Sequence, residues 1–373
     1  MVKQTPLYEI HKGLGAAFLP FGGWEMPLRY KSEKAEHEAV RQRVGLFDLS
    51  HMGEFLVRGP KAGEYLQRLL TQDIRRLTPG KAQYTFLLHP QGGILDDLIV
   101  YQLEPELYML VVNAATTEKD LSWLKEHLPS TGVVIEDITQ ETVLLALSGP
   151  RSAEILASLT ALPVKEMPYY TTHKGEVAGI PNVLVATTGY TGEWTYELFV
   201  RRDAGHKLWE ALLSADAAIV PAGLSARNTL RLEMGYLLYG TDIDENTTPL
   251  QAGAGWAVKL DKGEFIGREA LLRQKEQGLP SRLYGLISPS SKYIPRNGMP
   301  LQDEAGALIG RITSGSISPS LNIGIALAYL PPAYKPEDKV YMELRGEKVA
   351  LVVVRPPFVK ETSLSLRQKA RSA

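Results

Sequence analysis

Two adjacent carboxylates interrupt the apolar stretch at residues 93–101 and are the strongest candidates for chemistry in this sequence. Successive strand side chains point to opposite faces, so Asp96 shares a face with Leu98, and Asp97 shares the other with Ile99. Both faces are otherwise apolar, which predicts a strand buried on both sides. A carboxylate buried there is costly unless it is paired or hydrogen-bonded. Either aspartate alone could be structural, but the pair favours one functional carboxylate.

A second candidate segment, residues 188–193, contains two glycines that predict a tight turn, where backbone can approach a ligand closely. The strand expected to follow, residues 196–200, carries Glu197. The ordinary interpretation of a single strand acid is that it faces solvent, so Glu197 is a weaker candidate than the aspartate pair.

A third candidate is the predicted helix at residues 223–233, where Arg227 and Arg231 are four residues apart and share a face. A salt-bridged surface is the ordinary interpretation of such a pair. The helix is otherwise apolar enough to be buried, which favours a paired arginine.

The sequence lacks several common catalytic and binding motifs. It has no cysteine, which excludes disulfides, thiolate metal sites and a thiol nucleophile. None of the seven histidines lies within four residues of another, so no helical zinc pair is available and no metal site is predicted. Glycine-rich dinucleotide and phosphate loops and the nucleophile elbow of serine hydrolases are also absent, which argues against nicotinamide, flavin and triphosphate ligands.

Charge and hydropathy restrict the partners and the location. The formal net charge is -1, so we expect no strong attraction to nucleic acid or to an anionic membrane. The apolar runs are far shorter than the roughly 18 residues of a membrane span. The first residues lack the apolar core of a signal peptide, which predicts a cytoplasmic protein.

The elements that must position these residues form a mixed α+β pattern. Apolar runs at residues 84–89 and 94–102 flank Pro90-Gln91-Gly92-Gly93 and predict a hairpin. The order strand, helix, strands, helix, strand over residues 54–138 predicts a ferredoxin-like unit. We further expect helices at residues 33–44, 60–70 and 117–127.

A weak internal repeat joins two parts of the chain. Gly59-Pro60 and Gly149-Pro150 each follow an apolar strand and open a helix, about 90 residues apart. Such corners either recur because the same local sequence favours the same turn, or they mark two related α+β subdomains.

Residues 275–282 are polar and are predicted to form a linker, and the short apolar runs beyond it predict a small all-β domain. We expect the tail after Lys360 to be a frayed, solvated end.

Taken together, these segments resemble the T-protein (aminomethyltransferase) family of the glycine cleavage system. The resemblance covers nearly the whole chain, and its marks are residues 21–30, 44–54, 92–101, 111–114, 188–193, 221–233, 247–271, 294–298 and 313–321. It implies an α+β fold with a three-domain, cloverleaf-like architecture. The implied domains are residues 1–50 plus 140–230, residues 51–139 plus 231–278 with a ferredoxin-like fold, and a C-terminal β-barrel at residues 279–373.

The resemblance also implies a reaction. The family takes an aminomethyl group from the lipoyl arm of a carrier partner, the H-protein, and passes its methylene to tetrahydrofolate with release of ammonia. Tetrahydrofolate is then a co-substrate, and no metal, flavin or nicotinamide is needed. The family's catalytic aspartate falls on Asp96. The resemblance places Tyr84, Asn113 and Tyr190 in the folate pocket, makes Glu197 the acceptor for the pterin, and puts Arg227 against the folate or its partners.

The chain departs from the family pattern at two places beside the implied pocket. Trp194-Thr195 stands where Asp-Gly is usual after the Thr188–Glu193 turn, and Asn228 stands where an aspartate is usual. Two alternatives therefore stay open: a tetrahydrofolate-dependent demethylase of a small methylated substrate, and a non-catalytic folate-binding paralogue. Flavin-linked relatives need a dinucleotide fold that this chain lacks. The iron–sulfur-linked folate class carries a cysteine where residues 262–269 have none.

Overall fold

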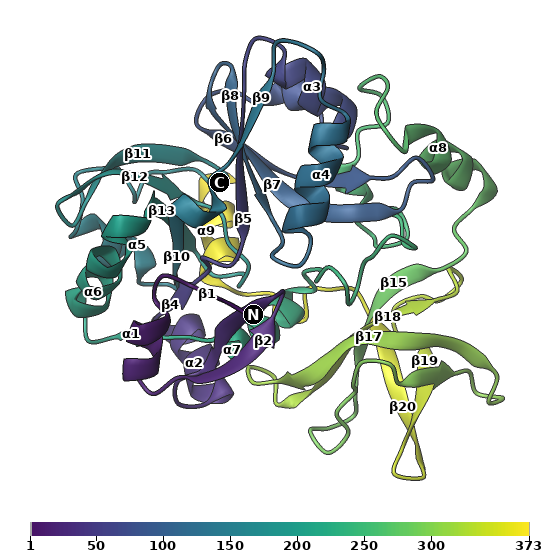
Figure 1. Ribbon diagram of the computed structural model, residues 1–373. Coiled ribbons are helices and arrows are strands. Elements are labelled where there is room, and N and C mark those ends of the chain that lie inside the picture. Colours follow the sequence, from purple (N-terminus) through teal and green to yellow (C-terminus); the bar gives the residue numbers. More distant parts are fainter. Residues whose placement is uncertain (1, 373) are drawn as a thin grey trace. The chain divides into compact units, whose positions relative to one another are not determined.

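The computed structural model describes residues 2–372, which form two compact units. Unit 1 contains residues 2–87, 96–227 and 362–372, and unit 2 contains residues 88–95 and 228–361. The chain thus leaves unit 1 and returns to it at the C-terminal end (Figure 1). The division into three domains expected above stays a prediction. No helix within residues 2–372 is both long and apolar enough to cross a membrane.

A six-stranded sheet forms one half of unit 1, with the order β11-β12-β13-β10-β4-β14. Its pairs are antiparallel except for the parallel pair of β14 and β4. Helices α5 and α6 pack on it over a core that includes Trp194 and Trp209. The elements are β4 (Val44–Asp48), β10 (Thr142–Ser148), α5 (Ser152–Ala157), β11 (Thr172–Val177), β12 (Ile180–Ala186), β13 (Thr195–Arg201), α6 (Gly205–Ala215) and β14 (Ile219–Pro221).

A five-stranded antiparallel sheet holds the aspartate pair and has the order β6-β7-β8-β5-β9. Four of its strands and two helices have the predicted ferredoxin-like arrangement, to which β6 adds an edge. The predicted hairpin is β6 and β7. The elements are β5 (Gly53–Arg58), α3 (Ala62–Leu69), β6 (Lys81–Leu88), β7 (Ile94–Glu104), β8 (Leu107–Val112), α4 (Thr117–Glu126) and β9 (Val134–Asp137).

The two sheets repeat one topology. Apart from single 3₁₀ turns, β5-α3-β6-β7-β8-α4-β9 and β10-α5-β11-β12-β13-α6-β14 run in the same element order. Their spatial strand orders also agree, except that β4 lies between β10 and β14. Each Gly–Pro corner opens a helix, and Gly59 and Gly149 have φ of 124° and 142°. A Cβ at either glycine would approach a carbonyl oxygen to 2.4 Å, so both corners require glycine.

The N-terminal part of unit 1 adds a three-stranded sheet of order β1-β3-β2 and two helices. The helix predicted at residues 33–44 ends earlier, at Gln42, because Val44 already begins the fully buried strand β4. These elements are β1 (Lys3–Gln4), α1 (Tyr8–Gly13), β2 (Ala17–Phe21), β3 (Trp24–Arg29) and α2 (Glu33–Gln42). Helix α7 (Leu224–Met234) begins in unit 1 and ends in unit 2.

Unit 2 contains the predicted all-β domain as a closed six-stranded barrel of order β15-β18-β17-β16-β19-β20. Inward residues of all its strands form a separate apolar core. The linker expected at residues 275–282 was placed too early, because helix α8 (Arg268–Gln277) continues to Gln277 and ends at Gly278. The strands are β15 (Arg282–Ile287), β16 (Pro300–Gln302), β17 (Leu308–Ser318), β18 (Ile323–Leu330), β19 (Lys339–Leu344) and β20 (Glu347–Val354).

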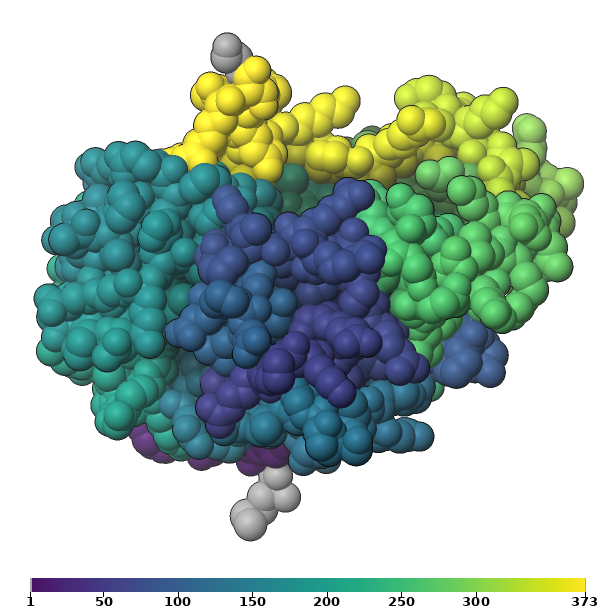
Figure 2. Space-filling view, turned by 90° about the horizontal axis from the view of Figure 1, so that it is seen from above, coloured from purple at the N-terminus to yellow at the C-terminus, as the bar shows by residue number. Residues whose placement is uncertain are grey.

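The prediction of a frayed tail is wrong. Residues after Lys360 form helix α9 (Ser363–Ser372), which packs on unit 1. The Trp194 amide donates to Ser363 Oγ at 2.8 Å, and that hydroxyl donates to the Glu193 carboxylate at 2.5 Å. The Arg367 guanidinium lies 4.5 Å from the Trp194 ring centroid, a cation–π contact. Figure 2 shows this yellow end of the chain beside the teal surface of unit 1.

Candidate functional site

The aspartate pair lies on β7 and is held by one residue that follows β8. Asn113 donates its backbone N–H to Asp96 Oδ2 at 3.0 Å. Its side-chain Nδ2 lies 2.8 Å from Asp96 Oδ1 and 3.0 Å from Asp97 Oδ1. The register that pairs Ile99 with Val111 extends to place Asn113 opposite Asp97. One amide therefore binds both carboxylates, although their side chains leave the strand on opposite faces.

The two carboxyl groups differ in exposure and in partners. Asp96 is fully buried, whereas Asp97 is partly buried and accepts a hydrogen bond at 2.8 Å from the hydroxyl of Tyr84 on β6. Burial, and after it the charge of the nearby Asp96, together raise the pKa of Asp97 to about 7. Burial also raises the pKa of Asp96, and the hydrogen bonds from Asn113 oppose that shift. Negative charge in this pair therefore resides mainly on Asp96 near neutral pH.

Glu197 is not the solvent-facing acid that its strand position first indicated. It lies on β13 with 8% of its surface exposed. The Tyr101 hydroxyl donates to its Oε2 at 3.3 Å, and the Thr188 hydroxyl donates to the same oxygen. Burial raises the pKa of Glu197, while Thr188, Arg227 and Tyr101 oppose the shift. Since both of these donors converge on Oε2, the other oxygen is the one available to a ligand.

Arg227 contacts Tyr190, and each of the two influences the charge of another predicted site residue. The Arg227 guanidinium lies 4.6 Å from the ring centroid of Tyr190. Burial lowers the pKa of Arg227, and Tyr190 and Glu197 favour its charged form. The pKa of Tyr84 lies well above its usual value because of burial, Asp97 and then Tyr190, so the two tyrosines are electrostatic neighbours. All six predicted site residues lie in unit 1, and we call them the polar set: hydrogen bonds join Asp96, Asn113 and, through Asp97, Tyr84, and a ring contact joins Arg227 to Tyr190.

Arg231 has a different role from Arg227, although the two share a helix. Its guanidinium donates to Asp242 at 2.7 Å and to Ser314 at 2.8 Å, all within unit 2. The unusual Asn228 accepts from Arg231 Nε at 2.9 Å. Arg231 is therefore the buried, paired arginine that the apolar helix indicated, and Asn228 contributes to its network.

The second departure, Trp194-Thr195, is part of the unit 1 core. Trp194 is 1% exposed and lies under α9. The Thr195 hydroxyl lies 2.7 Å from that of Ser148, and a Cβ on Gly189 would come within 2.6 Å of Thr195. Thr195 therefore packs directly against the glycine-containing turn that precedes Glu197.

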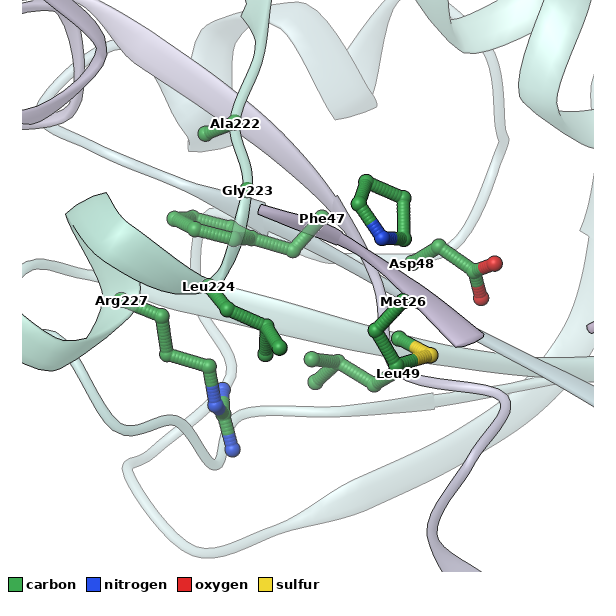
Figure 3. A pocket seen from close by; sticks show the side chains of 9 residues that line it. Met26, Phe47, Asp48, Leu49, Ala222, Gly223, Leu224 and Arg227 are labelled. Carbon is green, nitrogen blue, oxygen red and sulfur yellow. The ribbon is translucent and has the colours of Figure 1, made fainter. Parts of the chain in front are cut away.

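A pocket in unit 1 contains only one of the six predicted residues, Arg227 (Figure 3). Asp48 also lines it, and burial alone would raise the pKa of Asp48, but His11 at 2.9 Å and Ser50 at 2.6 Å lower it. Sequence reasoning missed this buried network. The available signal was that every lining residue falls in the matching segments 21–30, 44–54 or 221–233. The lining is Met26, Pro27, Phe47, Asp48, Leu49, Ala222, Gly223, Leu224 and Arg227.

The polar set has the chemistry of a site for an organic ligand. Within residues 2–372, no group of three or more His, Asp or Glu side chains is arranged to hold a metal ion. Carboxylates at Asp96 and Glu197 can accept hydrogen bonds from N–H groups. Tyr84 and Tyr190 supply aromatic surface, and Arg227 supplies a positive charge. A flat heterocycle with several N–H donors and an anionic part fits these groups.

Known family descriptions cover most of this chain. The description "GCVT N-terminal domain" matches residues 7–262, and "Glycine cleavage T-protein C-terminal barrel domain" matches residues 282–360. The second match spans the closed barrel of unit 2.

Individual relatives are similar over nearly their whole length. An aminomethyltransferase of Halothermothrix orenii is 45% identical over 361 residues, covering 96% of this chain and 100% of the relative. One of Flavobacterium psychrophilum is 42% identical over 363 residues, with coverage of 96% and 100%. The crystal structure of glycine cleavage system aminomethyltransferase T from Bartonella henselae is 37% identical, with a TM-score of 0.92 over 97% of this chain and 99% of that one.

Proposed function

The chain belongs to the glycine cleavage T-protein family and is an aminomethyltransferase, and we propose that the polar set around Asp96 is its catalytic and folate-binding site. The enzyme transfers the methylene of an aminomethyl group on a lipoyl arm to tetrahydrofolate. The carbon–sulfur and carbon–nitrogen bonds of that group break, and two bonds from the methylene carbon to folate nitrogens form. The two N–H protons of the folate leave with the products, ammonia and the free thiol.

The observation that carries the site proposal is the binding of Asp96 by Asn113. A fully buried carboxylate held by two N–H groups of one residue is fixed in position before substrate arrives. Positive charge develops on the methylene as ammonia or thiol departs. A fixed carboxylate beside it stabilises that charge and orients the attacking nitrogen. It also lies ready to take part in proton transfer.

We assign the folate-binding roles to the other five residues. Glu197 Oε1 accepts from the amino and amide N–H groups of the pterin, since its Oε2 already accepts from Tyr101 and Thr188. Tyr84 and Tyr190 lie along the ring. Asn113 bridges the catalytic carboxylate to this pocket, and Arg227 holds Tyr190 and balances the charge of Glu197.

The donor of the aminomethyl group is, in this proposal, a lipoylated carrier protein, the H-protein of the glycine cleavage system. The support is the family membership of the chain and the need for a thiol-linked aminomethyl group as substrate.

The test measures ammonia release from an aminomethylated lipoyl carrier with and without tetrahydrofolate. We expect strong tetrahydrofolate-dependent release together with methylenetetrahydrofolate. Asp96→Asn is expected to bind tetrahydrofolate normally and to lose most turnover, whereas Asp261→Asn, at an exposed position, retains it. Equal turnover by Asp96→Asn would remove Asp96 from its role. Folate binding without any release by the wild-type protein would favour a demethylase or a non-catalytic binder.

A further inference from the structure

A third aspartate beside the pair has no role in the proposed function. Asp120 lies in the first turns of α4 and is 0% exposed. Neither of its carboxyl oxygens accepts a hydrogen bond from an N–H or O–H group of the residues that the structure describes. Buried polar groups almost always have partners, so a carboxyl group without a donor requires an explanation.

The carboxyl group of Asp96 lies within side-chain hydrogen-bonding reach of Asp120. Thr116 is also close, but its hydroxyl donates to the Asn113 carbonyl oxygen at 3.0 Å, so its proton is already used. The charge of Lys119 opposes the rise in the pKa of Asp120, and Asp97 with its Tyr84 partner faces Asp96 from the neighbouring position on β7. The main neighbour of Asp120 is therefore another carboxyl group.

Two buried carboxyl groups in contact cannot both be ionised, so one of them holds a proton that the other accepts. The hydrogen bonds decide which one. Asp96 accepts two N–H groups from Asn113, which stabilise a carboxylate, whereas Asp120 accepts none. Burial, and after it Asp96, raises the pKa of Asp120 to about 10. The proton therefore resides on Asp120.

We propose that Asp120 is a positioning residue whose protonated carboxyl group donates a hydrogen bond to the carboxylate of Asp96. This inference rests on the proposed role of Asp96. With Asp120 as donor, Asp96 accepts three hydrogen bonds, two from Asn113 and one from Asp120.

The first turn of α4 links these donors. The Asp120 amide donates to the Thr116 carbonyl at 2.8 Å, and the Thr116 and Thr117 hydroxyls both donate to the Asn113 carbonyl at 3.0 Å. Asn113 and Asp120 thus hold the carboxylate of Asp96 from two points of one rigid segment. Three donors also favour the charged form of a buried carboxyl group, so they oppose the rise in the pKa of Asp96 that burial causes.

The first test reads the proton directly and does not depend on activity. Infrared difference spectra of the wild-type protein against Asp120→Asn are recorded at pH 8, above the pKa of Asp97 and below that of Asp120. We expect a protonated-carboxyl band in the wild-type protein that is missing from the variant. Other buried acids such as Glu54 are present in both proteins and cancel. Absence of that band would overturn the proposal.

The second test is the pH profile of kcat. Asp120→Asn keeps an N–H donor and is expected to keep kcat within a few-fold, with an unchanged acid limb. Asp120→Leu removes the donor, so the pKa of Asp96 rises and the acid limb moves to higher pH by about one unit, which lowers kcat up to about tenfold at pH values below the limb. Tetrahydrofolate affinity is expected to be unchanged in both.

The outcomes separate the two proposals. A leucine variant that folds and shows an unmoved acid limb would mean that Asp120 is merely structural. If Asp120→Leu fails to fold, the infrared comparison of the wild-type protein with Asp120→Asn still decides the protonation. If the infrared band is found and Asp96→Asn remains fully active, the hydrogen bond stands and the catalytic role of Asp96 falls.

Discussion

Replacing Asp97 with asparagine should make unit 1 more stable at neutral pH but not at acid pH. Burial, and after it Asp96, raises the pKa of Asp97 in the folded protein from 3.8 to about 7. In the unfolded chain this group ionises near its ordinary value. Between pH 4 and pH 7 the folded state therefore binds the extra proton, and the stability of the wild-type protein falls as pH rises. An asparagine at this position does not titrate. Its amide oxygen can replace Oδ1 as the acceptor from Asn113, and its amide N–H can donate to the Tyr84 hydroxyl in place of Oδ2.

The size of the effect follows from the two pKa values. They lie about three pH units apart, and each unit is worth about 1.36 kcal/mol, which gives about 4 kcal/mol. Asp97 is only partly buried, so solvent screens some of this energy. We expect Asp97→Asn to gain about 2–4 kcal/mol relative to the wild-type protein between pH 4.5 and pH 8.

Urea unfolding of both proteins in matched buffers from pH 4.5 to pH 8 measures this difference. Tryptophan fluorescence reports mainly on unit 1, because Trp24, Trp123, Trp194 and Trp209 lie there and only Trp256 lies in unit 2. Titrations shared by both proteins cancel in the comparison, and so does any pH-independent cost of the substitution.

A stability difference that stays constant over this pH range, within about 1 kcal/mol, would refute the reasoning, because Asp97 would then not retain its proton. Asp203→Asn is the matched control. Asp203 is exposed, and its hydrogen bond to Arg201 lowers its pKa. Asp203 is therefore ionised throughout pH 4.5–8 in both the folded and the unfolded chain, so the stability difference of this variant should stay constant over that range.

Two further substitutions test other features. Ser363→Ala removes the hydroxyl that joins Glu193 to the Trp194 amide. It should lower the stability of unit 1 by about 1–3 kcal/mol and speed hydrogen exchange in α9. Ser372→Ala, at the exposed end of α9, is the control, and equal exchange in both variants would contradict the role of Ser363 in docking α9. Glu197→Gln should weaken tetrahydrofolate binding about 10- to 100-fold, by loss of a charge-assisted hydrogen bond, and calorimetric titration that shows wild-type affinity would remove Glu197 from the pocket.

Local sequence patterns predicted much of the fold. The apolar runs on both sides of Pro90-Gln91-Gly92-Gly93 are continuous, so the hairpin of β6 and β7 was readable. The barrel strands alternate with turn residues, so the short apolar runs beyond the linker were enough to indicate an all-β domain. The repeated Gly–Pro corners left open whether they arise from local turn preferences or mark two related subdomains, and the shared element and strand order of the two sheets agrees with the second interpretation.

The features that sequence could not predict depend on partners far away in the chain. Strand alternation assigns Glu197 to a face but does not say what covers that face, and its cover, Tyr101, is 96 residues away. Helix α9 is largely polar and has few apolar residues of its own, so nothing local distinguishes it from a solvated tail. Asp120 has the pattern of an ordinary acid near a helix N-terminus, and only the proximity of Asp96 changes that interpretation.

The return of α9 to unit 1 has a consequence for the order in which the protein is made. Trp194 leaves the ribosome 169 residues before Ser363, the residue that binds its amide. At synthesis rates of about 5–20 residues per second, that gap lasts roughly 10–30 s. During this interval the nascent chain lacks the α9 side chains, Arg367 among them, that lie against the Trp194 ring in the finished protein. A prematurely terminated chain never receives these contacts or the hydroxyl that binds the Trp194 amide, so the α9 face of unit 1 distinguishes incomplete from complete translation products.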